Sequence, residues 1–208
     1  GNANDSSGNW NNATSSSIVY VDWKIWSKCA WSTSKTYITL PSTFMWTIWT
    51  WDFAISFWLN PVNPWTWQYP MLFWSFKDSS PYVWPTIFYD PLNIQRLWDC
   101  CIFRVTRSNE QCVSWASSLY WEWVNVVFTR ISWVCYVYYN WELKLQFNDT
   151  TYIPTWESAY IFSRNGHYQQ FCNTWAKFDE CIVETGVWWT AEKVKKQYTY
   201  AKWRFWVQ

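Results

Sequence analysis

The chain has 208 residues, a formal net charge of +1 and only 15% charged residues. This length suits a single all-β domain with a real hydrophobic core. The near-neutral charge leaves no basic field to hold a phosphate backbone, so nucleic acid is not an expected partner. No apolar run reaches the roughly 18 residues of a spanning helix, so no membrane span is expected in this chain.

Two units are expected along the chain. Residues 1–17 are rich in Asn, Ser and Gly without apolar periodicity, which predicts a flexible linker or tail. From Ile18 to residue 208, short apolar runs alternate with turn clusters, a spacing typical of a sandwich or barrel. Because the chain begins with Gly1 and not Met, we expect a mature form or a part of a larger protein.

The expected strands are short and rich in β-branched and aromatic residues, with turn residues at their ends. They span 36–40, 53–59, 71–76, 85–89, 101–106, 111–114, 123–129, 134–139, 142–147, 160–163 and 178–183. Hairpin turns are expected at 107–110 and at Asn140-Trp141. One helix is expected over 190–198, with Thr190 as its cap and Glu192 in its first turn. These elements predict an all-β fold, a sandwich or barrel, with one short C-terminal helix.

The usage of Trp and Gly is abnormal, because the chain has 24 Trp and only 4 Gly. Average Gly usage is about 7%, and strand-rich folds need turn residues that tolerate positive φ. Trp141 follows Asn140 between two alternating apolar runs, where the Gly of an Asn-Gly hairpin is typical. Trp65 and Trp67 also lie in segments that become turns when Trp is replaced by Gly.

We therefore hypothesise an alternative genetic code, in which most of these Trp are UGA codons that the host reads as glycine. The alternative is a genuinely Trp-rich protein. Trp58 and Trp123 lie inside predicted strands, where aromatic residues are favoured, so both are expected to be true tryptophans. Trp188 or Trp189 is a candidate for a third.

Several segments resemble one family of sandwich domains. Segment 52–61 (DFAISFWLNP) resembles the strand that opens the body of laminin-G-like and pentraxin-like domains, and 122–129 (EWVNVVFT) resembles their central strand. Segment 137–143 is similar to their next hairpin once Trp141 is read as Gly. Segments 175–180, 190–194 and 37–41 resemble the closing strand, the short helix and the early edge strand. The resemblance is to the concanavalin A-like lectin/glucanase superfamily and covers roughly residues 20–200.

The resemblance implies the fold class all-β, an antiparallel two-sheet jelly-roll sandwich with one short C-terminal helix. It also implies that the domain binds glycans or proteins through rim loops, sometimes with Ca²⁺. The expected function is a non-catalytic, lectin-like carbohydrate-binding or adhesion module, extracellular or on a bacterial cell surface. The alternative is a structural or protein-interaction module of a larger surface assembly, without a sugar site. The expected partner is a glycan or a surface protein, since fold alone does not fix the ligand.

The candidate ligand-binding residues are Tyr69, Asn165, His167 and Tyr168. The faces of the two tyrosines could stack on sugar rings, although a sandwich Tyr is often half-core with a wet hydroxyl. His167 is the single histidine of the chain, and a lone loop histidine is most often a solvated residue.

Calcium binding needs several carboxylate and carbonyl oxygens. Asp90, Asn148 and Asp149 are the candidate ligands for a possible Ca²⁺ site. The early calcium-ligating acids of the family would fall near 32–35, which contains none. One histidine and no Cys-x-x-Cys pair argue against zinc.

The chain has seven cysteines, a high and odd count. Cys172 and Cys181 are close in sequence and are the first candidates for a disulfide, which would imply an oxidising compartment. Buried free thiols are the alternative.

No catalytic pattern emerges, so the chain is not expected to be an enzyme. Glycoside hydrolysis needs two carboxylates about 5–10 Å apart, and no strand carries alternating acids. Asp179 and Glu180 are adjacent, point to opposite faces of a regular strand, and are expected to be structural. A serine triad would need His167 as its base, and reading Trp as Gly creates no nucleophile elbow or phosphate loop. A divergent glycosidase remains the third hypothesis.

Overall fold

The protein is described from a computed structural model. The described residues are 4, 6–8, 11–16, 18–22, 28–31, 37–41, 52–60, 71–74, 83–90, 100–106, 109, 111–114, 122–150, 160–161, 177–187 and 189–205.

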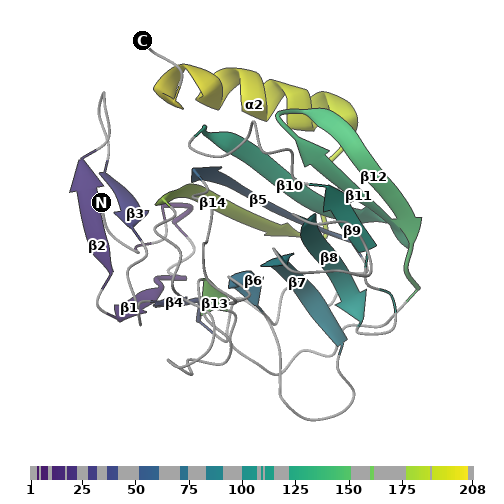
Figure 1. Cartoon of the computed structure of the whole chain (residues 1–208), viewed down its shortest axis with the longest axis horizontal. Coiled ribbons are helices and arrows are strands. Elements are labelled where there is room, and N and C mark those ends of the chain that lie inside the picture. Colours follow the sequence, from purple (N-terminus) through teal and green to yellow (C-terminus); the bar gives the residue numbers. More distant parts are fainter. Residues whose placement is uncertain are drawn as a thin grey trace.

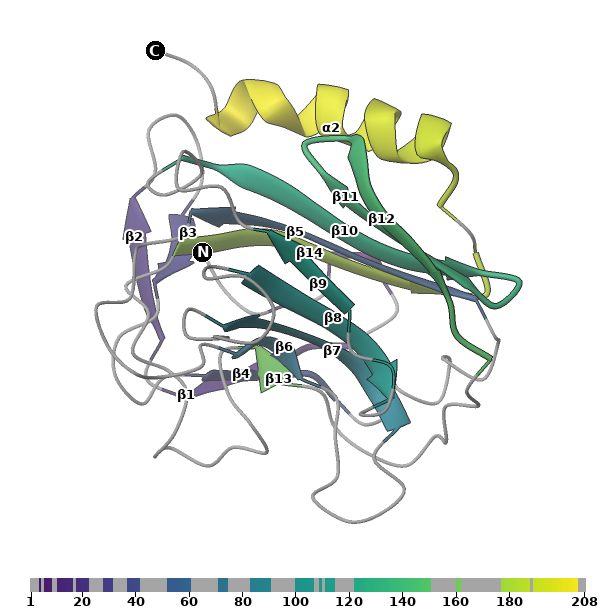
Figure 2. The same cartoon turned by 45° about the vertical axis from the view of Figure 1, so that its right-hand side comes forward.

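The strands form two antiparallel sheets, with a helix outside one of them (Figures 1 and 2). Sheet 1 has the order β1 (Thr14–Ser16), β4 (Tyr37–Thr39), β13 (Tyr160–Ile161), β6 (Met71–Trp74), β7 (Val83–Asp90), β8 (Cys100–Thr106), β9 (Gln111–Ser114). Sheet 2 has the order β12 (Glu142–Asn148), β11 (Val134–Tyr139), β10 (Val124–Ile131), β5 (Phe53–Asn60), β14 (Lys177–Thr185), β3 (Lys28–Trp31), β2 (Val19–Asp22). The helix α2 (Ala191–Phe205) lies across sheet 2.

The predicted fold class is confirmed, and most predicted strands are present with their ends moved by a few residues. The sequence missed β2 and β3, which pair with each other near the edge of sheet 2. It also missed β1, which lies within residues 1–17, where a linker was expected. This strand pairs with β4. The three residues of β1 are Thr-Ser-Ser, so no apolar alternation marks them, and pairing through the backbone needs none.

The helix begins as predicted and ends later. The Oγ1 of Thr190 accepts a hydrogen bond from the backbone N–H of Lys193 at 3.2 Å, which confirms Thr190 as the cap. Instead of ending near 198, the helix runs to Phe205. Nothing between 199 and 205 breaks a helix, and Ala201 is fully buried against sheet 2, so packing favours the additional turns.

Strand β5 is buried along all eight residues, because both of its faces are covered. One face carries Phe53, Ile55, Phe57 and Leu59, as the sequence predicted. These residues share their face with the inward residues of β10, including Phe128, whose ring lies 5.6 Å from that of Phe103 in sheet 1. This face is therefore the core between the sheets.

The opposite face of β5 packs against the helix. Trp58 stacks on Tyr198 with ring centroids 5.7 Å apart, and Trp123 and Ala201 complete this cluster. A second cluster under the first half of the helix joins Ala54, Val127, Tyr138, Trp189 and Val194. The molecule thus has three layers: helix, sheet 2 and sheet 1 (Figure 2). No helix in the described part of the chain is long and apolar enough to span a membrane.

We expect Phe128→Ala to destabilise the protein by about 3–5 kcal/mol, because the cavity would lie between the sheets. The Phe128 ring contacts those of Phe53, Phe103 and Phe147 at 5.2, 5.6 and 6.3 Å between centroids. Leu143→Ala is the matched control, since Leu143 is 51% exposed and its loss should change stability by no more than about 0.5 kcal/mol. Urea unfolding measures both, and equal losses would contradict the assigned core.

Candidate binding surface at the hairpin end of the sandwich

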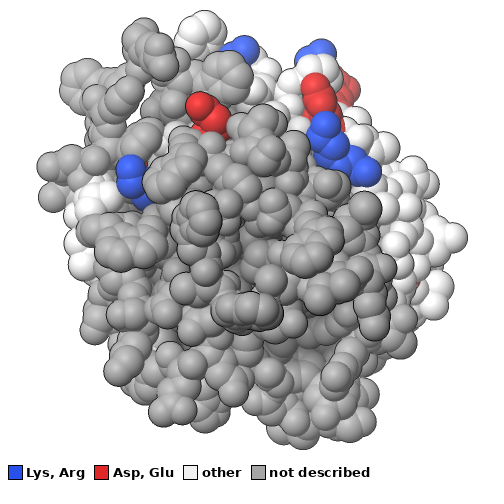
Figure 3. Space-filling model, in the orientation of Figure 1, with Lys and Arg blue, Asp and Glu red and all other residues white. Residues whose placement is uncertain are grey.

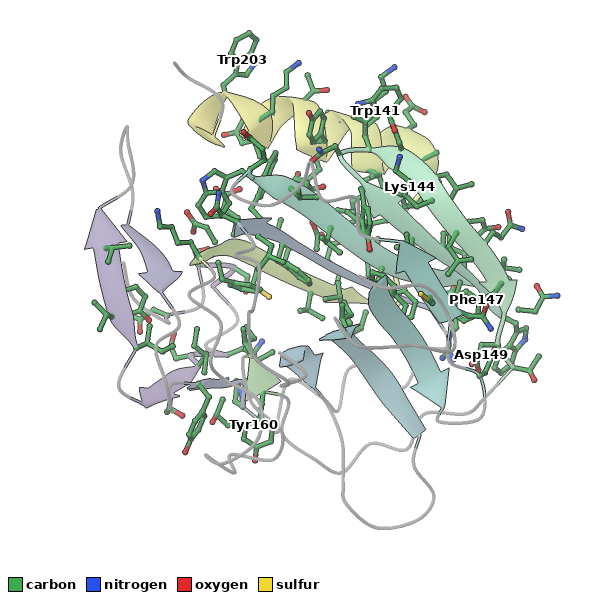
Figure 4. The ribbon with its side chains drawn as sticks, in the orientation of Figure 1. Trp141, Lys144, Phe147, Asp149, Tyr160 and Trp203 are labelled. Carbon is green, nitrogen blue, oxygen red and sulfur yellow. The ribbon has the colours of Figure 1, made fainter. Side chains whose placement is uncertain are left out.

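Polar residues from both sheets meet at one end of the sandwich. We call them the hairpin-end cluster: Asp52, Asn109, Gln111, Ser132, Trp133, Asn148 and Asp149. They come from the residue before β5, the β8–β9 connection, the start of β9, the β10–β11 turn and the end of β12. Figure 4 shows Asp149 beside the end of β12, close to Phe147.

Asn109 joins the two sheets at this end. Its Nδ2 donates to the backbone oxygen of Asn148 at 2.9 Å and to Oδ2 of Asp149 at 3.0 Å. Its Oδ1 accepts from Nε2 of Gln111 at 2.9 Å. One amide therefore links the β8–β9 connection of sheet 1 to the end of β12 in sheet 2.

The turn between β10 and β11 is held by its neighbours. Oδ1 of Asp52 accepts a hydrogen bond from the backbone N–H of Ser132 at 2.7 Å. The backbone N–H of Asp149 donates to the carbonyl of Trp133 at 2.8 Å, and that of Gly186 donates to the carbonyl of Asp52 at 3.0 Å. The ends of β5, β12 and β14 are thereby fixed to the same turn.

Arg130 lies buried behind the cluster, only 1% exposed, with its guanidinium 5.3 Å from the centroid of the Phe53 ring. Burial lowers the pKa of Arg130, whereas Cys135 and the nearby carboxylates of Asp149 and Asp52 raise it. Asp149 is itself 2% exposed. The two carboxylates therefore balance a buried cation, which would be costly if it were left alone.

The neighbours of Asp149 limit its ability to bind a metal ion. The Asp149 carboxylate already accepts a hydrogen bond from an amide and faces a guanidinium, and both compete with any cation for its oxygens. Of the cluster, Asn148 is exposed and remains accessible to a ligand hydroxyl. Within the described residues, no group of three or more His, Cys, Asp or Glu could hold a metal ion.

The predicted ligand residues Tyr69, Asn165, His167 and Tyr168 all lie outside the described residues. Asp90 ends β7, but its side chain is also outside the described part. The predicted ligand site and calcium site therefore stay predictions.

The sequence reasoning missed the role of Arg130, although a signal was present. Arg130 alternates with Val124, Val126 and Phe128 on the inward face of β10. A charged residue at an inward position predicts a buried charge that needs a partner. The partners Asp52 and Asp149 are distant in sequence, so alternation alone could not name them.

The acids of β14 have a structural role. The strand has a bulge between Asp179 and Ile182, and Glu180 has a φ of 48°. Oδ1 of Asp179 accepts a hydrogen bond from the backbone N–H of Glu180 at 2.8 Å, so the Asp179 side chain supports the backbone, as expected for one of the two acids.

Cys181 is a free thiol in the structure, as are Cys112 and Cys135, and Cys172 lies outside the described residues. The structure therefore does not show the bridge between Cys172 and Cys181. Burial raises the pKa of the Cys181 thiol to about 12, and it also raises the pKa of Cys135.

A second surface, formed by the helix and the β11–β12 hairpin, carries charges of both signs along the top of Figure 3. Lys144 pairs with Glu142 at 2.7 Å, and both side chains are exposed. Tyr200 and Trp203 are 77% and 66% exposed. Exposed pairs of this kind contribute little energy, and this mixed surface is typical of a solvated face.

No protein-family model matches the sequence, and no curated protein sequence matches it. Solved structures do resemble the fold. Domain 4 of AbnA, an extracellular arabinanase of Geobacillus stearothermophilus in complex with arabinotriose, has a TM-score of 0.67 and 17% identity. The similarity covers 94% of this chain and 92% of that domain.

Two toxin structures are also similar. The binding domain of Paraclostridial Mosquitocidal Protein 1 has a TM-score of 0.70 and 15% identity, over 95% of this chain. The receptor-binding domain of botulinum neurotoxin C/D mosaic serotype has a TM-score of 0.66 and 12% identity, over 91% of this chain. This chain spans only 49% and 47% of those structures, about half of each. At these identities the likeness establishes the fold, and all three neighbours are domains of larger proteins.

We expect Asp149→Ala to lower the free energy of unfolding by about 3 kcal/mol, because the buried Arg130 loses a counter-charge. Asn148→Ala is the adjacent control and should have little effect, since its side chain is exposed. Urea unfolding compares the two. An unchanged midpoint for Asp149→Ala would contradict its structural role.

Cys135 and Cys181 should resist alkylation by iodoacetamide at pH 8 in the folded protein. Their pKa values are raised in the fold, so the reactive thiolate is scarce until unfolding returns the pKa to its ordinary range. Peptide mass spectrometry with and without urea measures the labelling. Cys181 that is labelled only after reduction would instead establish a disulfide.

Proposed function

We propose that the chain is a non-catalytic carbohydrate-binding module of a secreted or cell-surface protein. The observation that carries the proposal is the likeness to AbnA domain 4, whose structure holds arabinotriose. That likeness extends over 94% of this chain and 92% of that domain. The finer assignment to the laminin-G-like and pentraxin-like group rests on the sequence segments alone.

The proposed site is formed by Tyr69, Asn165, His167 and Tyr168. The chemistry of these residues supports it, because tyrosine faces cover sugar rings while amide and imidazole groups bond hydroxyls. The helix covers the outer side of β5 and β10 and the core occupies their inner side, so these two central strands offer no surface to a ligand.

The absence of catalysis is part of the same proposal. Three of the acids in the described part of the chain, Asp52, Asp149 and Asp179, each accept a hydrogen bond from a backbone or amide donor through one carboxylate oxygen. A glycosidase needs two carboxylates free to act on the bond between sugars. These three are committed to the structure.

A protein-interaction module without a sugar site is the second candidate. It is favoured by the likeness to the receptor-binding domain of a botulinum neurotoxin and the binding domain of a mosquitocidal protein. The likeness to a domain of an extracellular arabinanase supports an extracellular or surface location.

We expect the protein to bind arabinotriose or a related oligosaccharide on a glycan array, and to release no product from it. Tyr168→Ala should weaken binding about two- to tenfold, since aromatic contacts contribute about 0.5–1.5 kcal/mol beyond area burial. Tyr200→Ala is the matched control, because Tyr200 lies exposed on the helix and should not affect affinity. Isothermal titration calorimetry measures both variants.

The outcomes separate the hypotheses. No binding to any glycan, with or without calcium, would favour the protein-interaction module, and cleavage of the oligosaccharide would restore the glycosidase. We expect chelation with EDTA to leave affinity unchanged, because Asp149 is engaged with Asn109 and lies near the buried Arg130. Loss of binding in EDTA would instead support Asp90, Asn148 and Asp149 as calcium ligands.

A further inference from the structure

Two hairpins of sheet 2 share the same unusual turn. Strands β10 and β11 are joined by Ser132-Trp133 alone, because Ile131 pairs with Val134. Strands β11 and β12 are joined by Asn140-Trp141 alone, because Tyr139 pairs with Glu142. Both connections are therefore two-residue loops, the shortest common hairpin connection.

All four turn residues have positive φ. The values are 46° and 74° at Ser132 and Trp133, and 48° and 69° at Asn140 and Trp141. Positive φ at both central residues is the mark of a type I′ turn, whose twist matches that of the flanking strands. The sign of φ at Trp141 is the one predicted from the sequence for a glycine position.

The first position of the β11–β12 turn is occupied by a suitable residue, Asn140. Asn tolerates the left-handed region well, and Oδ1 of Asn140 accepts a hydrogen bond from the backbone N–H of Asn125 at 2.9 Å. The second position of each turn is occupied by a tryptophan, Trp133 or Trp141, which is unsuited to positive φ. A Cβ in the left-handed region approaches the next carbonyl, a bulky side chain there is an outlier, and Gly is strongly preferred at this position.

Three other tryptophans have a different environment. Trp58, Trp123 and Trp189 are 1%, 4% and 1% exposed and are not among the positive-φ residues of the described chain. Trp58 stacks on Tyr198, and Nε1 of Trp189 donates to Oε2 of Glu184 at 2.7 Å. Glycine at these three places would leave large cavities between the helix and sheet 2.

We propose that Trp133 and Trp141 are glycines in the native protein, encoded by UGA codons that the host reads as glycine, and that Trp58, Trp123 and Trp189 are true tryptophans encoded by UGG. The turns then become Ser-Gly and Asn-Gly, and Asn-Gly is the strongest of the short hairpin signals. The chain total of 24 Trp and 4 Gly fits the same division. Trp65 and Trp67 lie outside the described residues.

Glycine at positions 133 and 141 would remove two contacts of the tryptophan rings with neighbouring cations. Arg130 lies 5.6 Å from the Trp133 ring centroid, but it keeps the Phe53 ring at 5.3 Å and the nearby carboxylates. Lys195 lies 4.7 Å from the Trp141 ring centroid and is exposed, so water replaces that contact. Trp141, 41% exposed, is then no aromatic platform for a sugar.

Trypsin digestion of the protein isolated from its natural host tests the proposal. The peptide 131–144, cut after Arg130 and Lys144, contains both turns. Its mass should correspond to glycine at 133 and 141, and the gene should carry UGA at both codons. The peptide 178–193 is the internal control and should retain an indole at 189. Indoles at both turn positions, or UGG at both codons, would overturn the proposal.

A stability comparison gives an independent readout. The double variant Trp133→Gly/Trp141→Gly should melt at a higher temperature than the chain with both tryptophans, by about 2–4 °C for each replacement. Trp58→Gly and Trp189→Gly should each lower the melting temperature. A lower melting temperature for the double variant would contradict glycine as the native residue at the turns.

Discussion

The burial of β5 and β10 on both faces is the constraint on which the rest of the structure depends. Phe53, Ile55, Phe57 and Leu59 face sheet 1, while Ala54 and Trp58 face the helix. A strand covered on both sides needs neighbours that pair with its full backbone, and β10 and β14 supply them. The three-layer arrangement follows, since the helix must cover the apolar face that sheet 1 does not reach.

This double burial explains the polar features of the molecule. Arg130 lies at the end of the inward face of β10, so it enters the fold as a buried cation. Asp52 and Asp149 are brought beside it by the start of β5 and the end of β12. Asn125 lies on the opposite face, where its Nδ2 donates to the carbonyl of Phe57 at 3.3 Å. Arg130 and Asn125 are thus placed by strand pairing, and the groups they interact with come from distant segments of the chain.

The same constraint removes the central strands from any binding surface. The inner side of β5 and β10 lies in the core and their outer side lies under the helix, whereas β12 at the edge of the sheet stays exposed. The described strand ends are held by Asn109, Asp52 and Asp149, which gives the adjoining loops a rigid frame.

The two hairpin turns connect sequence and structure in another way. Strand twist requires positive φ at Ser132, Trp133, Asn140 and Trp141, whatever residues stand there. Asn140 tolerates positive φ and Trp141 does not. The sequence pattern alone therefore shows that Trp141 is unsuited to its place in the turn. The backbone confirms the geometry at Trp141 and adds the second case at Trp133, which the sequence reasoning did not single out.

The sequence by itself determined the strand-rich class, the inward face of β5, the Thr190 cap and the Asn140-Trp141 turn. These depend on periodicity and on local dihedral preference, which a short window of residues contains. Only the tertiary structure decided that Ala54 and Trp58 lie under the helix, that Thr14–Ser16 forms an edge strand, and that Arg130 lies near Asp149. Those features depend on which distant segment covers or pairs with a given face, and no local pattern encodes that choice.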